Sequence, residues 1–319
     1  MRSHDENLAL RREQIAEARQ QHEARTGNAD LAETARQFET YRPRLFGIAY
    51  RVIGTIAEAE DVVQDVWLKW QTYDRDRVEQ PEAFLVTTTT RTAINVLQSA
   101  RVRREAYVGP WLPEPIDTES NPEIEAERND SLSLALLVLL ESLSPAERAA
   151  FVLREAFGYE YRDIAGILET NEVATRKLVS RAREHVASGH RSSVTRSVHQ
   201  RFLQAFVTAA RSGDVAELEQ VLAADVVSYS DGGDVVHAAR IAIVGRERVA
   251  KFVGAFSTWF WDGVDVHEIE INGQPSIAIL AGGEPVTVLS ICASGSGIER
   301  LFWMLNPTKL ERIAIPATA

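Results

Sequence analysis

Two kinds of hydrophobic pattern divide the chain. Between about Phe38 and Ala187, apolar residues recur at the spacing of amphipathic helices. After Ser193, short β-branched runs alternate with glycine or asparagine breaks, which is typical of strands. The expected strands span residues 226–230, 235–243, 266–271, 276–280, 286–293 and 298–305. We therefore predict two all-α helical modules and a C-terminal α+β domain, in which an antiparallel sheet packs on helices.

A helix-turn-helix is predicted between Ser144 and Arg191. The segment Ser144-Pro145-Ala146-Glu147 has the layout of a capping box with proline at the first helical position, and Gly158 would end that helix. A short second helix follows, and Asn171 is placed to cap a third. In the third helix the residues expected to pack inward are Val173, Leu178, Val179 and Ala182.

The outer face of this third helix is basic. It carries Arg176, Lys177, Ser180, Arg181 and Arg183. Arginine and lysine side chains on an exposed helix reach guanine edges and phosphates in the major groove, so this face predicts DNA binding. The alternative is a solvated basic face on a helical bundle.

A second surface lies on the helix expected at 58–70. Its apolar side, suited to the core, carries Val62, Val63, Val66 and Trp70. At i, i+3, i+4 and i+7 another side carries Asp61, Gln64, Asp65 and Leu68. An exposed leucine flanked by carboxylates suits the docking of a basic partner helix. The alternative is a solvated acidic face with a stray leucine.

A third surface lies on the helix expected to start near Pro81. Phe84, Ile94 and Leu97 suit the core, and Thr87–Thr90 require tertiary packing because β-branched residues lower helix propensity. The polar side carries basic and amide residues: Arg91, Asn95, Gln98, Arg101, Arg103 and Arg104. This combination suits phosphate contact together with base reading.

The net charge of the whole chain opposes binding to a polyanion, but the charge is unevenly distributed along the sequence. The net charge is −11 and the pI about 5.3. However, residues 91–104 contain arginines and no acid, while residues 108–131 carry most of their charge as carboxylates. The basic segments are therefore concentrated enough to meet nucleic acid.

Composition limits the remaining function classes. The single cysteine, Cys292, excludes an intramolecular disulfide and a cysteine zinc site, and it fits a reducing cytoplasm. The longest apolar run, 134–140, is too short to cross a bilayer, and the first residues lack a hydrophobic signal segment. We expect a cytoplasmic protein with no membrane partner, no cofactor, no metal site and no catalytic site.

Proline and glycine positions and changes in composition along the sequence predict five segments. The expected order is a loose or disordered arm at 1–37, a helical module at 38–107, an acidic proline-rich linker at 108–131, the helix-turn-helix module at 132–190 and the α+β domain at 196–319.

Residues 38–187 resemble an extracytoplasmic-function (ECF) sigma factor of the sigma-70 family. Residues 58–67 are similar to the helix that such factors dock on the β′ clamp helices of RNA polymerase. Residues 83–104 are similar to the segment that melts and reads the −10 element, and residues 161–183 to the helix-turn-helix that reads the −35 element. These blocks occur in the family's order.

The rest of the chain resembles the Sigma-J-type group, whose members carry a SnoaL-like C-terminal extension with a cone fold. Trp111, Leu112, Pro113, Glu114 and Pro115 match the group's WLPEP motif. Asp231, Gly232 and Gly233 match the start of its DGGGK segment, although Asp234 and Val235 stand where the group has glycine and lysine. Residues 306–310 resemble its NPDKL motif, with Thr308 in place of aspartate, and we take Asn306, Pro307 and Leu310 from it as regulatory residues.

The resemblance implies the partners and the roles of these residues. Core RNA polymerase would be bound through its β′ clamp helices and β flap, and promoter DNA through the −10 and −35 faces. The extension would tune polymerase binding and initiation in cis. Our own hypothesis is that the two C-terminal motifs hold the linker and fix the spacing of the two DNA-reading modules.

Two rival hypotheses remain. In the first, the C-terminal domain senses a small molecule or is a cyclase or isomerase that uses Asp225, Asp231, His237 or His267 beside the aromatic cluster 259–261. Aspartate beside two glycines is more often a turn residue, and the aromatic cluster is more often core. In the second, the chain is a dimeric regulator in which only the helix-turn-helix is functional.

Overall fold

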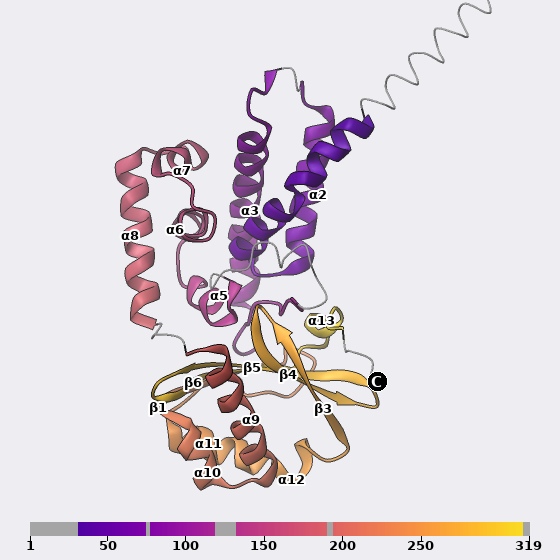
Figure 1. Cartoon of the computed structure of the whole chain (residues 1–319), viewed down its shortest axis with the longest axis vertical. Coiled ribbons are helices and arrows are strands. Elements are labelled where there is room, and N and C mark those ends of the chain that lie inside the picture. The colour runs from indigo at the N-terminus through magenta and orange to yellow at the C-terminus, as the bar shows by residue number, and fades with distance from the viewer. Residues whose placement is uncertain (1–30, 75–76, 119–131, 190–193, 315–319) are drawn as a thin grey trace, which may run out of the picture.

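The computed structural model describes residues 31–74, 77–118, 132–189 and 194–314. Most of the predicted arm and linker, residues 1–30 and 119–131, therefore lie outside the described residues. A helical part and a sheet-containing part pack against each other (Figure 1). In the described ranges, no helix is long and apolar enough to cross a membrane.

The helical part begins with a helix over residues 31–53. It continues with α2 (Ile56–Thr72), α3 (Pro81–Glu105), α5 (Leu134–Leu140), α6 (Pro145–Phe151), the π-helical turn η3 (Val152–Ala156), α7 (Tyr161–Ile167) and α8 (Glu172–Gly189). One continuous hydrophobic cluster joins both helical modules, because it contains Leu97 of α3 together with Phe151 of α6 and Val179 of α8. The two modules are thus packed into a single body.

Local sequence signals place several of these helices. The capping box at Ser144 and Glu147 is confirmed, because the serine side chain accepts from the Glu147 amide and the glutamate side chain accepts from the Ser144 amide. The expected single helix up to Gly158 instead changes to a π turn at Val152. α3 remains continuous through the threonine run, because Thr89 and Thr90 are completely buried against the rest of the helical part.

The C-terminal part is a six-stranded sheet with helices on one face. Its elements are α9 (Arg196–Ser212), α10 (Val215–Val221), β1 (Leu222–Asp231), β2 (Ile243–Val244), α11 (Arg246–Ala255), α12 (Ser257–Phe260), β3 (Val264–Ile271), β4 (Gln274–Ala281), β5 (Glu284–Ser294), β6 (Gly297–Met304) and α13 (Pro307–Leu310). The strand order is β2-β1-β6-β5-β4-β3.

Two expectations about this sheet are wrong. The sheet is mixed, because β1 pairs parallel with β6 while every other pair is antiparallel. Residues 235–243 form a loop and not a strand; Val235 and Ile241 are exposed, and only Ile243 enters β2. The β-branched content of this segment predicted a strand, but its apolar side chains find no buried face to cover. The helices α11 and α12 were not predicted.

The two faces of the sheet have different partners. One face packs against α9 to α12, through residues such as Phe206 and Val249. The opposite face packs against the linker, α5 and α13, through Leu112, Leu134 and Leu310. Figure 1 shows α5 at the end of the helical part that faces the sheet, and α13 close to the same face. Consequently the C-terminal domain completes its second layer with segments of the helical part.

Leu112→Ala should destabilise the whole chain. Leu112 is fully buried in the cluster between linker and sheet, so truncation leaves a cavity and should lower the free energy of unfolding by about 2–4 kcal/mol. Denaturant unfolding followed by circular dichroism measures this change. Val108→Ala is the matched control: Val108 is exposed in the same segment and its loss should change the free energy by less than about 0.5 kcal/mol. Equal effects at both positions would contradict the buried interface.

Candidate functional site

The acidic face of α2 is exposed as its periodicity suggests. Asp61, Gln64, Asp65 and Leu68 are all exposed, and the Leu68 side chain keeps 52% of its surface in water. The opposite side of α2 is buried, and Trp70 on that side is almost completely enclosed. Within the described residues, no ion pair engages Asp61 or Asp65. An apolar side chain between free carboxylates is therefore available to a partner.

The polar side of α3 divides into two sets. Asn95, Gln98 and Arg103 are exposed, and Asn95 and Arg103 border a shallow polar hollow between α2 and α3. Arg91, in contrast, turns toward the helix-turn-helix module. Its guanidinium donates to the Ile167 carbonyl (2.8 Å) and the Gly166 carbonyl (3.0 Å) at the end of α7, and it pairs with Glu169 at 2.7 Å.

Glu141 binds two further arginines of α3, Arg101 and Arg104, whereas Arg103 pairs with Glu58. Arg104 pairs with the Glu141 carboxylate, and so does the completely buried Arg148 of α6. Arg101 donates to the backbone carbonyl of Glu141 (3.1 Å) and to that of Leu143. Burial lowers the pKa of Arg104, and the Glu141 carboxylate opposes that shift. Two of the arginines predicted to face DNA thus hold the start of the second helical module.

The outer face of α8 is exposed, as predicted. Its exposed residues include Arg176, Lys177, Ser180, Arg181 and Arg183. Asn171 caps the helix, because its side chain accepts from the Ala174 amide at 2.9 Å. The expectation for Val173 is wrong: it is 65% exposed, since the helix turns Thr175 inward instead and buries it completely.

Ion pairs already occupy most of this face. Arg176 pairs with Glu172 one turn earlier, Arg181 pairs with Glu147 at 2.9 Å, and Arg183 pairs with Glu155 at 2.7 Å. Exposed pairs of this kind are worth little, so DNA phosphates compete with them easily. Lys177 forms no ion pair within the described residues.

A buried carboxylate joins the linker to the C-terminal domain. Asp231, at the end of β1, is fully buried. One carboxylate oxygen accepts from the Tyr107 hydroxyl (2.5 Å) and the Gly233 amide (3.2 Å). The other accepts from the Leu112 amide (2.8 Å) and the Lys309 ammonium (2.7 Å). We call this cluster of Asp231, Tyr107, Leu112 and Lys309 the Asp231 clamp.

Lys309 was not selected from the sequence, although it lies inside the matched motif 306–310. It is 8% exposed and also donates to the Leu112 carbonyl. Burial lowers the pKa of Lys309, and the charge of Asp231 opposes that shift. Lys309 supplies the positive charge that pairs with the buried Asp231 carboxylate. Tyr107 was also missed, and burial and its bond to Asp231 raise its pKa.

The two glycines after Asp231 permit this geometry. A Cβ added to Gly232 would lie 2.3 Å from the Val236 carbonyl oxygen, so any larger residue collides with the backbone. Gly233 has a φ of +58° and faces Asn306, whose side-chain amide donates to the Tyr107 hydroxyl at 2.8 Å. Asn306 also caps α13, while Pro307 starts it.

The linker side chains fill positions between the two parts. Trp111 contacts two cations, with the Arg104 guanidinium 3.4 Å and the Lys309 ammonium 4.3 Å from its ring centroid. Glu114 is buried and accepts from the Ile56 amide at 2.7 Å, which caps the start of α2. Burial raises the pKa of Glu114, and that hydrogen bond opposes the shift. Pro113 and Pro115 are buried on either side of Glu114.

The linker then follows the sheet edge. Asn272, in the turn between β3 and β4, accepts from the Ile116 amide (3.2 Å) and donates to the Tyr50 hydroxyl (2.9 Å). The Thr118 amide donates to the Glu270 carbonyl (3.2 Å). Asn272 was not predicted; its left-handed φ of +52° before Gly273 marks a tight hairpin turn, which the Asn-Gly pair signals in the sequence.

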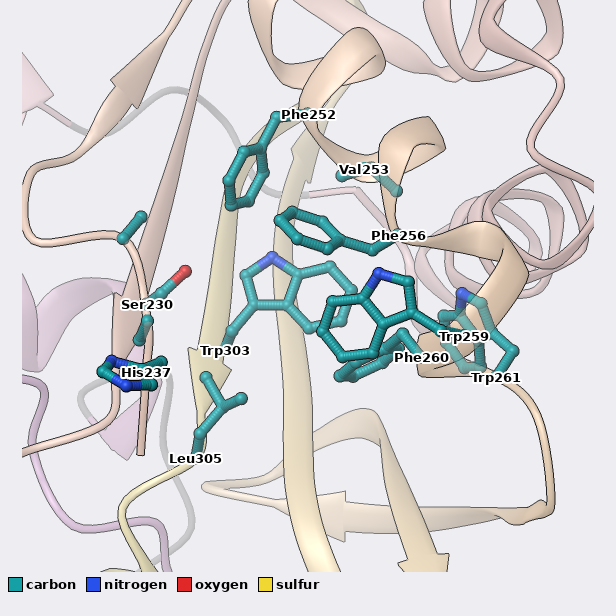
Figure 2. Close-up of a pocket in the computed structure, with 12 residues that line it drawn as sticks. Ser230, His237, Phe252, Val253, Phe256, Trp259, Phe260, Trp261, Trp303 and Leu305 are labelled. Carbon is teal, nitrogen blue, oxygen red and sulfur yellow. The ribbon is translucent and has the colours of Figure 1, made fainter. Parts of the chain in front are cut away.

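The candidate acid–base residues of the C-terminal domain do not converge. Only His237, of the four named, borders the aromatic cavity of this domain (Figure 2). Asp231 is occupied by the clamp, while Asp225 is exposed and His267 lies on β3. Among the described residues, no group of three or more His, Cys, Asp or Glu side chains is placed to hold a metal ion.

Lys309→Met should release the linker from the C-terminal domain. It leaves the Asp231 carboxylate buried without its cation, which should lower the free energy of unfolding by about 3–5 kcal/mol. Asp231→Asn in the same chain should add much less than it costs alone, because the two groups are coupled. Chemical denaturation of the four variants measures this cycle. Lys251→Met is the control, since the exposed pair with Glu247 should contribute nothing measurable. Additive effects would argue against the clamp.

Comparisons with known proteins agree with this architecture. Sigma-70 region 2 matches residues 37–103, and sigma-70 region 4 matches residues 133–186. The ECF RNA polymerase sigma factor SigJ of Mycobacterium tuberculosis is 35% identical over 222 residues, 68% of this chain and 71% of SigJ. The probable ECF sigma factor SigI of that organism is 27% identical over 278 residues, 86% of this chain and 93% of SigI.

The whole arrangement also has a solved counterpart. The crystal structure of M. tuberculosis SigJ matches with a TM-score of 0.69 and 27% identity, covering 86% of this chain and 97% of that one. The match therefore extends through the helical part and the sheet-containing domain. On these grounds the chain belongs to the ECF RNA polymerase sigma factors.

Proposed function

We propose that this chain binds core RNA polymerase, directs it to promoters by reading −10 and −35 elements, and is held in a closed form by its C-terminal domain. Membership of the ECF sigma factors carries the first part. One observation carries the last part: the Asp231 clamp fastens the segment that connects the two helical modules.

The α2 face is the proposed polymerase contact. Leu68 supplies an apolar centre, and Asp61 and Asp65 supply charge that complements a basic helix such as one of the β′ clamp helices. This face lies on exposed surface, so it remains open while the clamp is closed. The β flap is the proposed contact of the helix-turn-helix module.

Promoter reading requires the two modules to separate. The −10 and −35 elements lie about 25 base pairs apart, which is about 85 Å along B-form DNA. In the closed form α3 packs directly on α6 and α7, and Arg91 bonds the end of α7. Both elements are therefore out of reach of one closed chain. Polymerase binding must supply the free energy that breaks these contacts.

The C-terminal domain would set the cost of opening. It binds the linker through Leu112 and residues 116–118, and the linker in turn carries Trp111, which stacks on Arg104. A tighter clamp stabilises the closed form and delays DNA contact. A looser clamp lowers that cost, which makes the domain a regulator in cis.

Leu68→Ala should weaken binding to core polymerase. Removing the apolar centre of a docking face should raise the Kd by about tenfold, equivalent to ~1.4 kcal/mol. Fluorescence anisotropy of labelled chain titrated with purified core enzyme measures the Kd. Val244→Ala, an equally exposed apolar truncation on β2, should leave it unchanged. A Leu68→Ala chain that binds like the unmodified one would remove α2 as the docking surface.

Opening should be visible as a change in distance between the modules. With Cys292→Ser, dyes at the exposed Val102→Cys near the end of α3 and at Ser188→Cys near the end of α8 should transfer energy efficiently in the free chain, because Arg101 bonds Leu143 and the adjacent Ser142 bonds His185 of α8. Transfer should become poor once core enzyme and promoter DNA are added. The control pair Arg162→Cys and Ser188→Cys lies within the helix-turn-helix module and should not change. Transfer that stays high in the promoter complex would contradict the opening.

The same dyes test the role of the clamp. In the Lys309→Met chain, less core enzyme should be needed for half-maximal loss of transfer, because the closed form is less stable. An unchanged midpoint with a confirmed loss of stability would show that the clamp has no part in opening.

A further inference from the structure

Val173 interrupts the basic face of α8 with an apolar side chain. It is the second residue of that helix and is 65% exposed. The other large apolar side chains of the helix, Leu178, Val179 and Val186, are buried or half-buried against the helical part. Packing within the chain therefore does not account for a valine at this position.

Val173 shares one side of α8 with three polar residues of the predicted −35 face. Arg176, Lys177 and Ser180 follow it at i+3, i+4 and i+7, and all three are exposed. Figure 1 shows α8 on the outer side of the helix-turn-helix module, with α6 between it and α3. This side of the helix is therefore open to a partner from outside the chain.

The first turn of α8 holds Val173 in a fixed position. The Asn171 side chain accepts from the Ala174 amide at 2.9 Å, and the buried Thr175 hydroxyl donates to the Asn171 carbonyl at 3.1 Å. Valine branches at Cβ, so its side chain has one strongly preferred rotamer in a helix. The two methyl groups of Val173 are thus presented to a partner with little loss of conformational entropy on binding.

The neighbouring cations differ in how far they are already engaged. The Arg176 guanidinium pairs with Glu172 at 2.6 Å and lies over the Tyr161 ring, 4.3 Å from its centroid. Lys177, in contrast, forms no ion pair in the described part of the chain. In a helix-turn-helix, the first residues of the recognition helix contact base edges. At this end of α8, Val173 and Lys177 are therefore the side chains ready to meet them.

The chemistry of the major groove narrows what each of these side chains recognises. A lysine ammonium donates to O6 and N7 of guanine and to phosphates. Valine has neither donor nor acceptor, so a polar base edge offers it nothing. The C5 methyl group of thymine is the apolar feature in the groove, and apolar side chains contact it. Position and chemistry thus agree on thymine for Val173.

We propose that Val173 is a specificity-determining residue of this sigma factor and contacts the C5 methyl group of a thymine in the −35 element. The inference rests on the proposed function, because it requires that α8 reads that element. It adds the identity of one base. Since Lys177 lies one turn further along the same side, the thymine is close to the base or phosphate that Lys177 contacts. Recognition at this position depends on a methyl group and not on a hydrogen-bonding edge.

Replacement of thymine by deoxyuridine tests the contact, because it removes the methyl group and keeps the hydrogen-bonding edge. Holoenzyme formed from the full chain and purified core enzyme first selects duplexes from a pool randomised over both promoter elements. Each thymine of the selected −35 element is then replaced singly, and competition in fluorescence anisotropy measures the Kd. At one thymine the replacement should raise the Kd about fourfold, the effect of one buried methyl group.

A valine truncation completes the cycle. The Val173→Ala chain should bind the thymine duplex about fourfold more weakly, and it should distinguish the two duplexes by less than about 1.5-fold. Val235→Ala is the matched control, because it makes the same truncation at an exposed valine of the C-terminal domain. It should distinguish the duplexes as the unmodified chain does. Circular dichroism checks that both variants are folded.

The possible failures are distinguishable. A selected −35 element without thymine, or one whose thymines all tolerate deoxyuridine, would contradict the Val173 contact while leaving promoter reading intact. So would a Val173→Ala chain that still distinguishes the two duplexes. If Val173→Ala instead weakens binding to core enzyme in the absence of DNA, the residue belongs to the polymerase interface and the proposal is wrong. A pool from which no sequence is enriched would overturn the proposed function, and this inference with it.

Discussion

The structure depends on keeping one carboxylate buried. Asp231 has lost all contact with water, and an isolated buried charge of this kind costs several kcal/mol. Its cost is offset only while Tyr107, Leu112 and Lys309 all reach it, and these residues come from the end of α3, the linker and α13. If one of these three segments leaves, the Asp231 carboxylate loses a hydrogen-bond donor and the contacts of the other two segments are weakened. The constraint is therefore a long-range one, which ties residues more than a hundred positions apart into one arrangement.

Because the linker is fixed, the DNA-reading modules are fixed with it. The two modules are bound to each other. Arg91 of α3 donates to carbonyls at the end of α7, and Arg101 and Arg104 bind the segment around Glu141. Part of the positive charge of these basic segments is therefore engaged within the chain, by Glu169 and Glu141. These contacts use carbonyls and carboxylates, the same acceptor chemistry that a phosphate offers.

Local sequence patterns correctly predicted those features that depend on residues near each other in the chain, such as helix faces and helix starts. The periodicity of α2 placed Val62 and Trp70 in the core and Leu68 on the surface, and the capping box at Ser144 started α6 as expected. Failures occurred where distant segments decide. Residues 235–242 have strand composition but pair with no strand, and the parallel pairing of β1 with β6 is not encoded in either strand alone. The motifs located the clamp region, yet only the fold identifies Lys309 as the partner of Asp231. The roles of the predicted site residues stay predictions.

Arg104 connects the two states of the chain. In the closed form its guanidinium pairs with Glu141 and stacks on Trp111, so it helps to hold the linker in place. In the proposed open form the same guanidinium faces the −10 element. One cation cannot serve both, so DNA binding and linker fastening compete for it. Thermodynamic linkage makes that competition reciprocal: whatever strengthens the clamp weakens promoter contact, and promoter contact loosens the clamp by the same free energy. In the proposed mechanism the C-terminal domain would therefore act on promoter reading through the linker and Arg104.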